Sequence, residues 1–210
     1  MSIPFITVEG PIGVGKTSLA KAIGNTYQFE LLKEIVDENP FLNKFYEDIA
    51  EWSFQTEMFF LCNRYKQLSD IEKKYLSKDT AVVADYHIFK NLIFAKRSLS
   101  KEEYEKYEAI YHILTKDMPV PNLVIYLDAS IDVLVDRIDL RGREFEKKIS
   151  TTYLEQLSSD YRMFIDDFEL KHPEIPVIRF NGDEMDFVQN NQDLQIILEK
   201  VDETLHRRSL

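Results

Sequence analysis

Residues 5–17 read Phe5-Ile6-Thr7-Val8-Glu9-Gly10-Pro11-Ile12-Gly13-Val14-Gly15-Lys16-Thr17. The last eight residues fit G-x-x-x-x-G-K-[ST], and they follow an apolar run that predicts a strand and precede a segment that predicts a helix. Glycines at these positions let the backbone curl so that its N–H groups point at phosphate oxygens, and the helix N-terminus adds positive potential. The stretch predicts a site for a nucleoside triphosphate.

Each polar residue of this loop has an expected task. Lys16 supplies a mobile charge to the β- and γ-phosphates, and the Thr17 hydroxyl coordinates Mg²⁺. We therefore expect ATP to be bound by Gly10, Pro11, Ile12, Gly13, Val14, Gly15, Lys16, Thr17 and Ser18.

Short apolar runs alternate with longer periodic segments along the rest of the chain, which is typical of a parallel sheet covered by helices. The expected strands span residues 5–8, 31–36, 81–84, 123–127 and 176–180. The expected helices span residues 16–27, 40–78 (as two helices), 89–97, 100–117, 130–140, 151–171 and 194–205. The pattern predicts one α/β domain over residues 1–210, with about five parallel strands.

Composition narrows the class of partner. The 26 lysines and arginines against 37 aspartates and glutamates give a net charge of −11, which argues against nucleic acid as a partner. Cys62 is the single cysteine, so we expect neither a disulfide nor a zinc cluster. Residues 1–5 lack the basic and apolar regions of a signal peptide, and no run is long enough to span a membrane. We expect a cytoplasmic protein.

Two carboxylates lie where open α/β sheets place ligands, at the carboxyl ends of strands. Asp85 ends the third expected strand, a position suited to Mg²⁺ or to its waters, and Glu34 lies in the second. The alternative for each is an ordinary solvated carboxylate at a strand end.

Arg137, Arg141 and Arg143 form a basic cluster in this acidic chain. Arg137 and Arg141 share a helix face, and Gly142 then ends the helix and leaves Arg143 in a charged loop over residues 141–150. Arginines on such a loop can close over phosphates as a lid, with Arg137 and Arg141 binding ATP. The alternative is a basic helix end that complements the helix dipole.

Together these motifs resemble the deoxynucleoside kinases, most closely the bacterial branch that phosphorylates deoxyguanosine and deoxyadenosine. The resemblance covers nearly the whole chain and is carried by Glu9-Gly10 to Thr17, Glu34-Ile35-Val36, Trp52-Ser53-Phe54, Arg64, Asp85, Arg137 to Glu146, Tyr153 to Leu157 and Asp183 to Val188. It implies a P-loop kinase fold, a homodimer, and transfer of the γ-phosphoryl group of ATP, with Mg²⁺, to the 5′-hydroxyl of a deoxynucleoside.

The resemblance also implies roles for individual residues. Glu34 would be the general base on the 5′-hydroxyl, Tyr46 and Glu146 would bind the 3′-hydroxyl, and Arg141 and Arg143 would be catalytic lid arginines. The remaining expected contacts are Asn91 and Phe94 to the nucleoside, and Asp183 and Phe187 to the adenine of ATP.

One departure matters. Many members of the family have an acidic residue followed by Arg-Ser at the end of the third strand, whereas this chain has Asp85-Tyr86-His87. The arginine that would contact the reacting oxygen is therefore missing. Arg64, the lid or Lys16 could replace it.

The resemblance implies that the base is read by a side chain on the helix that contains Trp52, where Gln55 and Glu57 are the candidates. Gln55 and Glu57 are two residues apart, so only one of them can face the site. Glu57 and Arg64 are seven residues apart, within about 20° on one helix face, which favours Glu57. A carboxylate accepts two hydrogen bonds, as the N1–H and N2 amino groups of guanine require, while Arg64 could donate to O6 and N7. The alternative is a buried salt bridge between Glu57 and Arg64, with another residue reading the base.

We therefore expect a purine deoxynucleoside kinase with deoxyguanosine as the preferred substrate, and a deoxyadenosine or broader deoxynucleoside kinase as the alternative. A nucleoside monophosphate kinase would need a further basic site for the acceptor phosphate, and none is evident outside the lid. A nucleotide-binding switch protein is disfavoured, because the chain has neither an Asn-Lys-x-Asp motif nor a glycine shortly after Asp85.

Overall fold

The computed structural model describes residues 3–36 and 38–207, and Met1 and Ser2, part of the segment expected to lack a signal peptide, lie outside them. Over the described ranges the chain forms one five-stranded sheet in the order β2-β3-β1-β4-β5, with every strand parallel to its neighbours. Its strands are β1 Phe5–Glu9, β2 Glu30–Leu32, β3 Val82–Ala84, β4 Leu123–Asp128 and β5 Val177–Asn181. The predicted parallel α/β architecture is confirmed.

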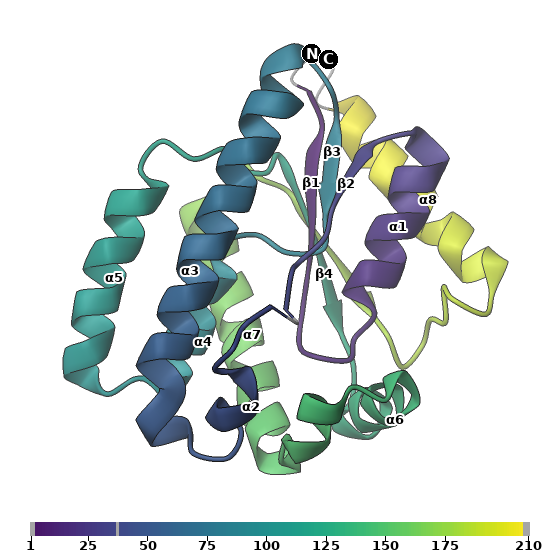
Figure 1. The fold of residues 1–210 in the computed structure, drawn as a ribbon. Coiled ribbons are helices and arrows are strands. Elements are labelled where there is room, and N and C mark those ends of the chain that lie inside the picture. The colour runs from purple at the N-terminus through teal and green to yellow at the C-terminus, as the bar shows by residue number, and fades with distance from the viewer. Residues whose placement is uncertain (1–2, 37, 208–210) are drawn as a thin grey trace.

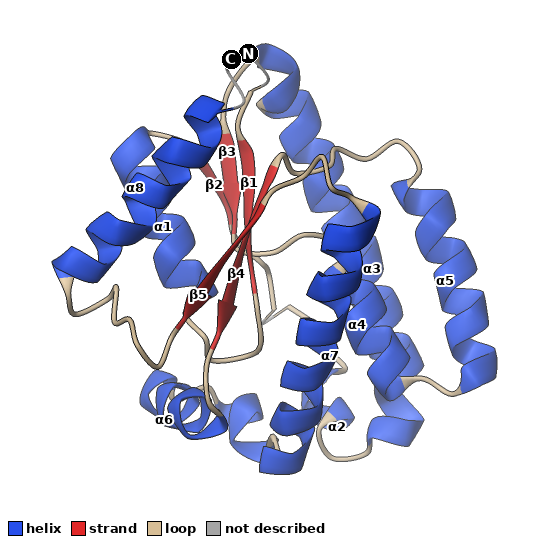
Figure 2. Ribbon diagram, turned by 180° about the vertical axis from the view of Figure 1, so that it is seen from behind, coloured by secondary structure: helices blue, strands red, loops and turns tan. Residues whose placement is uncertain are grey.

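Helices cover both faces of this sheet (Figures 1 and 2). They are α1 Lys16–Tyr27, α2 Leu42–Phe45, α3 Ile49–Lys74, α4 Lys90–Ser98, α5 Lys101–Thr115, α6 Ile131–Arg141, α7 Thr151–Lys171 and α8 Asn191–Arg207, with 3-10 turns η1 Leu76–Lys78 and η2 Glu144–Lys148. Among the described residues, no helix has the length and apolar character needed to cross a membrane.

The two faces have separate cores, as expected for a central sheet that is buried on both sides. Leu19 of α1 and Ile197 of α8 pack against one face of β1 and β4. The opposite face is covered by α3, α4, α5 and α7, through buried residues such as Leu61, Tyr107 and Leu157. Because β1 lies between β3 and β4, the loops after these strands meet at one edge of the sheet. A topological switch point of this kind is where open α/β sheets bind ligands.

The second strand is shorter than predicted and ends at Leu32 rather than at residue 36. Its partner β3 ends at Ala84, and the Asp85 side chain accepts the backbone N–H of Glu34 at 2.7 Å, which takes that group out of the ladder. Glu34 consequently lies in the loop after β2, not in the strand.

One other prediction about local structure is confirmed and one needs correction. The segment 40–78 holds two α-helices as predicted, the single turn α2 and the long helix α3, followed by the turn η1. The expected loop 141–150 contains η2, which places Glu146 in a buried position facing the two arginines at the end of α6. The predicted α7, residues 151–171, agrees with the structure at both ends.

Gly10 is required where β1 turns into the phosphate loop. Its φ is +145°, and a Cβ built there would lie 2.2 Å from the carbonyl oxygen of Leu127. We expect Gly10→Ala to lower the free energy of unfolding by more than about 2 kcal/mol, since backbone strain of this kind alone costs of order 1–3 kcal/mol. Gly142→Ala is the matched control, because Gly142 also has a positive φ, of +67°, but its nearest neighbour lies 3.9 Å away. Urea titration should show the larger loss for Gly10→Ala, and equal losses would contradict the argument.

Candidate active site

The phosphate loop ends in a half-buried lysine whose side chain bonds back to the loop itself. Lys16, at the start of α1, donates from Nζ to the carbonyl oxygens of Gly10 and Pro11, both at 2.8 Å. Burial, reinforced by the nearby charge of Lys90, lowers the pKa of Lys16 to about 7, although Glu34 opposes the shift. A lysine held in this way favours the arrival of an anion, because a phosphate group would replace neutral carbonyls as its partner.

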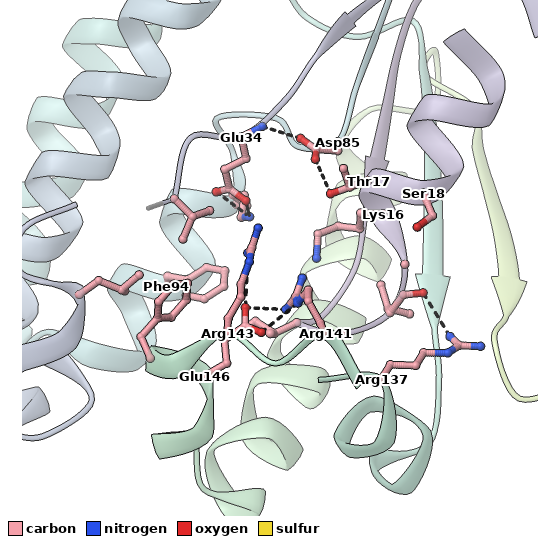
Figure 3. A pocket seen from close by; sticks show the side chains of 18 of the residues that line it. Lys16, Thr17, Ser18, Glu34, Asp85, Phe94, Arg137, Arg141, Arg143 and Glu146 are labelled. Atoms are coloured by element: carbon pink, nitrogen blue, oxygen red, sulfur yellow. Dashed lines mark hydrogen bonds and ion pairs between the residues drawn. The ribbon is translucent and has the colours of Figure 1, made fainter. Parts of the chain in front are cut away.

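Asp85 joins the phosphate loop to the loop after β2. One of its oxygens accepts the Thr17 hydroxyl at 2.5 Å, and the other accepts the backbone N–H of Glu34 at 2.7 Å (Figure 3). A hydroxyl beside a carboxylate is the hard oxygen donor set that Mg²⁺ prefers, so Thr17 and Asp85 fit the metal predicted for them.

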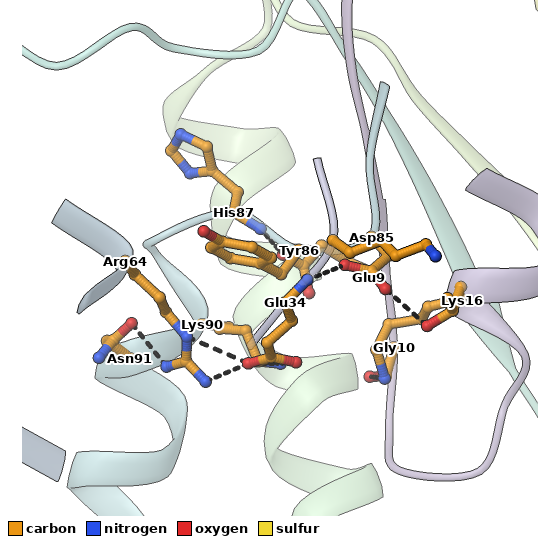
Figure 4. Close-up of polar contacts among 12 residues, drawn as sticks. Glu9, Gly10, Lys16, Glu34, Arg64, Asp85, Tyr86, His87, Lys90 and Asn91 are labelled. Atoms are coloured by element: carbon orange, nitrogen blue, oxygen red, sulfur yellow. Dashed lines mark hydrogen bonds and ion pairs between the residues drawn. The ribbon is translucent and has the colours of Figure 1, made fainter. Parts of the chain in front are cut away.

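Glu34 is the centre of the polar network. Its Oε1 accepts hydrogen bonds from Arg64, including one from Nε at 3.1 Å, and Lys90 Nζ lies 3.0 and 2.9 Å from Oε1 and Oε2 (Figure 4). Burial by itself would raise the pKa of Glu34, but the charges of Lys90 and Arg64 outweigh it and hold the pKa well below its ordinary value. The carboxylate is therefore ionised at any physiological pH.

Lys90 is a site residue that the sequence reasoning missed. Its side chain is 4% exposed and lines the same pocket as Lys16 and Glu34. A signal was available, because Lys90 is a charged residue in the otherwise mostly apolar run from residue 86 to residue 94. Charged side chains in such runs are buried only when they are paired.

Glu57 faces the pocket from α3, whereas Gln55 is exposed, as the helix geometry predicted. Its Oε1 lies 3.4 Å from the hydroxyl of Ser98, which also donates to the carbonyl oxygen of Phe94 at 2.8 Å. Its Oε2 is buried and has no hydrogen-bond partner among the described residues. Burial raises the pKa of Glu57 to about 7, against the lowering effect of Arg64. One oxygen of this carboxyl group therefore lacks a hydrogen-bond partner, on a side chain that lines the pocket.

Arg64 and Glu57 do not form the salt bridge considered above: among residues 3–36 and 38–207, the ion-pair partner of Arg64 is Glu34. The third nitrogen of the guanidinium, Nη1, donates to Asn91 at 2.7 Å, and the group lies 4.6 Å from the centre of the Phe60 ring. Arg64 is thus held at Glu34, and its expected contact with O6 and N7 loses support.

Tyr46, Glu146, Arg141 and Arg143 meet at the pocket mouth. Arg141 donates to both oxygens of Glu146, at 2.9 and 2.5 Å, and Arg143 donates to Oε1 at 3.5 Å (Figure 3). Burial and the negative charge of Glu146 raise the pKa of the Tyr46 phenol, so the two side chains are near enough to interact electrostatically. Tyr46, just after α2, and Glu146, in η2, are a hundred positions apart in the sequence and line the same pocket.

Not every predicted contact residue reaches the pocket. Arg137 and Phe187 line it, but Asp183 does not: its carboxylate accepts the backbone N–H of Ser130 at 2.8 Å. Asn91 is fully buried behind the pocket, where it accepts from Arg64 and donates to the hydroxyl of Tyr107 at 2.7 Å. Asn91 thus orients Arg64 instead of lining the nucleoside pocket.

The site as a whole is one pocket of about 550 Å³. The site residues predicted from the sequence that line this pocket are Ile12, Gly13, Val14, Gly15, Lys16, Thr17, Ser18, Glu34, Tyr46, Glu57, Arg64, Asp85, Phe94, Arg137, Arg141, Arg143, Glu146 and Phe187. Phosphate-binding, acidic and aromatic groups thus share one space, which is large enough for small-molecule substrates.

A sequence model of the deoxynucleoside kinase family matches residues 6–206 of this chain. The chain belongs to the deoxynucleoside kinase family. It is an ATP-dependent deoxynucleoside kinase, and this confirms the phosphotransferase prediction over the nucleotide-binding switch.

Relatives of this kinase share its full length. It is 53% identical over 202 residues to a deoxyguanosine kinase of Bacillus subtilis, covering 96% of this chain and 98% of the relative. It is 30% identical to a deoxyadenosine/deoxycytidine kinase of the same organism, covering 96% and 93% of the two chains. A solved deoxyadenosine kinase of M. mycoides with bound dCTP superposes with a TM-score of 0.79 at 25% identity, over 95% of this chain and 99% of that one.

Proposed function

We propose that this kinase transfers the γ-phosphoryl group of ATP to the 5′-hydroxyl of deoxyguanosine. The observation that carries the choice of base is Glu57, whose buried carboxyl group faces the pocket with one oxygen unpartnered. Guanine offers two adjacent donors, N1–H and the N2 amino group, and a carboxylate can accept from both. The name of the Bacillus subtilis relative supports the same choice.

The catalytic steps follow from the positions of the residues. The 5′-oxygen forms a bond to the γ-phosphorus as the bond to the β,γ-bridging oxygen of ADP breaks, and the hydroxyl proton passes to Glu34. Lys16 leaves the carbonyls of its loop for the phosphates, and Arg141 and Arg143 close from the pocket mouth. Mg²⁺ held at Thr17 and Asp85 would neutralise charge on the β- and γ-oxygens.

The nucleoside would be oriented by other residues that line the pocket. Tyr46 and Glu146 are placed to bind the 3′-hydroxyl, and Phe94 lies beside Lys90 with its ring 5.4 Å from Nζ, where it can pack on the base. Assembly as a homodimer stays a prediction of the resemblance, and a cytoplasmic location stays a prediction of the sequence.

The decisive experiment is ATP-dependent phosphorylation of deoxyguanosine, deoxyadenosine, deoxycytidine and thymidine, each compared with its monophosphate, by kcat/KM. We expect deoxyguanosine to be the best substrate by at least about tenfold, because a mismatched buried hydrogen bond costs about 1–3 kcal/mol. Preference for another nucleoside would remove the assignment of guanine, and turnover of monophosphates alone would mean that the acceptor site is misplaced.

A further inference from the structure

Three cationic side chains surround Glu34. The cationic side chains of Lys16, Arg64 and Lys90 all act on this one carboxylate. Lys16 and Lys90 are close enough for the charge of Lys90 to lower the pKa of Lys16. An arrangement of this kind favours a bound polyanion between the two lysines.

An ion pair that served only to hold Glu34 would not need Lys90. Arg64 already bonds to Glu34 through two nitrogens, and it is itself held by Asn91 and by the ring of Phe60. A buried lysine is expensive to desolvate, and its flexible stem lets the ammonium change partners, which the planar guanidinium of Arg64 does less readily.

The position of Lys90 also suits a role in the reaction. It lies in the first turn of α4, five residues after Asp85, and shares the pocket with Lys16 and Thr17. The loop between Asp85 and Lys90 is held by Glu9, which accepts the backbone N–H of His87. The missing arginine of the third strand thus has a cationic counterpart one short loop further along the chain.

We propose that Lys90 is a further catalytic residue, whose ammonium leaves Glu34 in the ternary complex and contacts the phosphoryl group during its transfer. The inference rests on the proposed function. Lys90 keeps its proton throughout: it stabilises charge on the oxygens of the γ-phosphoryl group while the 5′-oxygen bonds to phosphorus, ADP leaves, and Glu34 takes the hydroxyl proton. Its departure also makes Glu34 a better base, since the strongest opposing cation moves away when the proton must be accepted.

The test uses Lys90→Met, which keeps the length of the side chain and removes the charge, together with Lys90→Arg, which keeps the charge. Lys96→Met is the matched control, because Lys96 is exposed on the same helix. Removing one such charge-stabilising donor costs roughly 10²- to 10³-fold in kcat. We expect that loss for Lys90→Met at every pH from 6 to 9, with the KM for deoxyguanosine changed less than about threefold, and we expect Lys90→Arg to recover at least tenfold of it.

Several outcomes would overturn the proposal. If the loss disappeared at alkaline pH, Lys90 would act only as the counter-ion of Glu34. Equal losses in Lys90→Met and Lys90→Arg would indicate a packing role, as would a KM effect without a kcat effect. Thermal unfolding checks that each variant folds. A wild-type enzyme inactive on all four deoxynucleosides would sink the proposed function instead, so the two failures are distinguishable.

Discussion

Replacing Glu34 by glutamine is expected to lower kcat by roughly 10²- to 10⁴-fold, the usual contribution of a general base. The carboxylate is the acidic group on which Arg64 and Lys90 converge, and it is ionised because these cations hold its pKa down. Glutamine has nearly the same shape but cannot accept the proton of the 5′-hydroxyl. The expected loss is therefore in kcat, measured by ADP release at saturating ATP and deoxyguanosine.

A second variant separates chemistry from stability. Glu34→Gln leaves two buried cations without a counter-ion, and breaking a buried pair costs about 3–5 kcal/mol. Glu34→Asp keeps the charge and shortens the side chain, so it should fold like the wild type and lose activity to a smaller extent. Glu30→Gln is the matched control, because Glu30 is an exposed glutamate at the start of β2, the strand that precedes the Glu34 loop. If folded Glu34→Gln keeps kcat within about threefold of the wild-type value, Glu34 is not the base.

What could be predicted from the sequence is local. The phosphate loop lies where its motif places it, because the loop is determined by neighbouring residues between β1 and α1. The helix face that carries Glu57 was predicted for the same reason, since the regular repeat of a helix sets which residues share a side.

The parts that were missed depend on contacts between distant segments. Lys90 and Glu34 are 56 residues apart, and neither local sequence indicates that the two side chains form an ion pair. The helix repeat places Arg64 on the same face as Glu57, but in the structure Arg64 bonds to Glu34, which lies in the loop after β2. That loop in turn begins where the partner strand β3 ends at Ala84 and Asp85 accepts the backbone N–H of Glu34, which is a property of the sheet and not of residues 31–36.

The second large effect is expected on base selectivity. Glu57→Gln should reduce kcat/KM for deoxyguanosine by roughly 10²-fold and increase it for deoxyadenosine, because one oxygen becomes a donor that opposes the N1–H or N2 amino group of guanine. The amide instead matches adenine, which offers an acceptor at N1 beside a donor at N6. Competition assays with both nucleosides in one mixture measure the ratio directly. Gln55→Glu, on the exposed side of the same helix, is the control and should leave the ratio unchanged.

The pH dependence of selectivity gives an independent readout of the same residue. Because burial raises the pKa of Glu57 to about 7, the group is protonated below that pH and then carries one O–H donor and one acceptor oxygen, as an amide does. Above pH 7 it is a carboxylate and can accept twice. The wild-type preference for deoxyguanosine over deoxyadenosine should therefore increase as the pH rises from 6 to 8, whereas Glu57→Gln should show no such rise. A preference that is constant with pH in the wild type and unchanged in Glu57→Gln would remove Glu57 from the base pocket, and the base would have to be read by another residue.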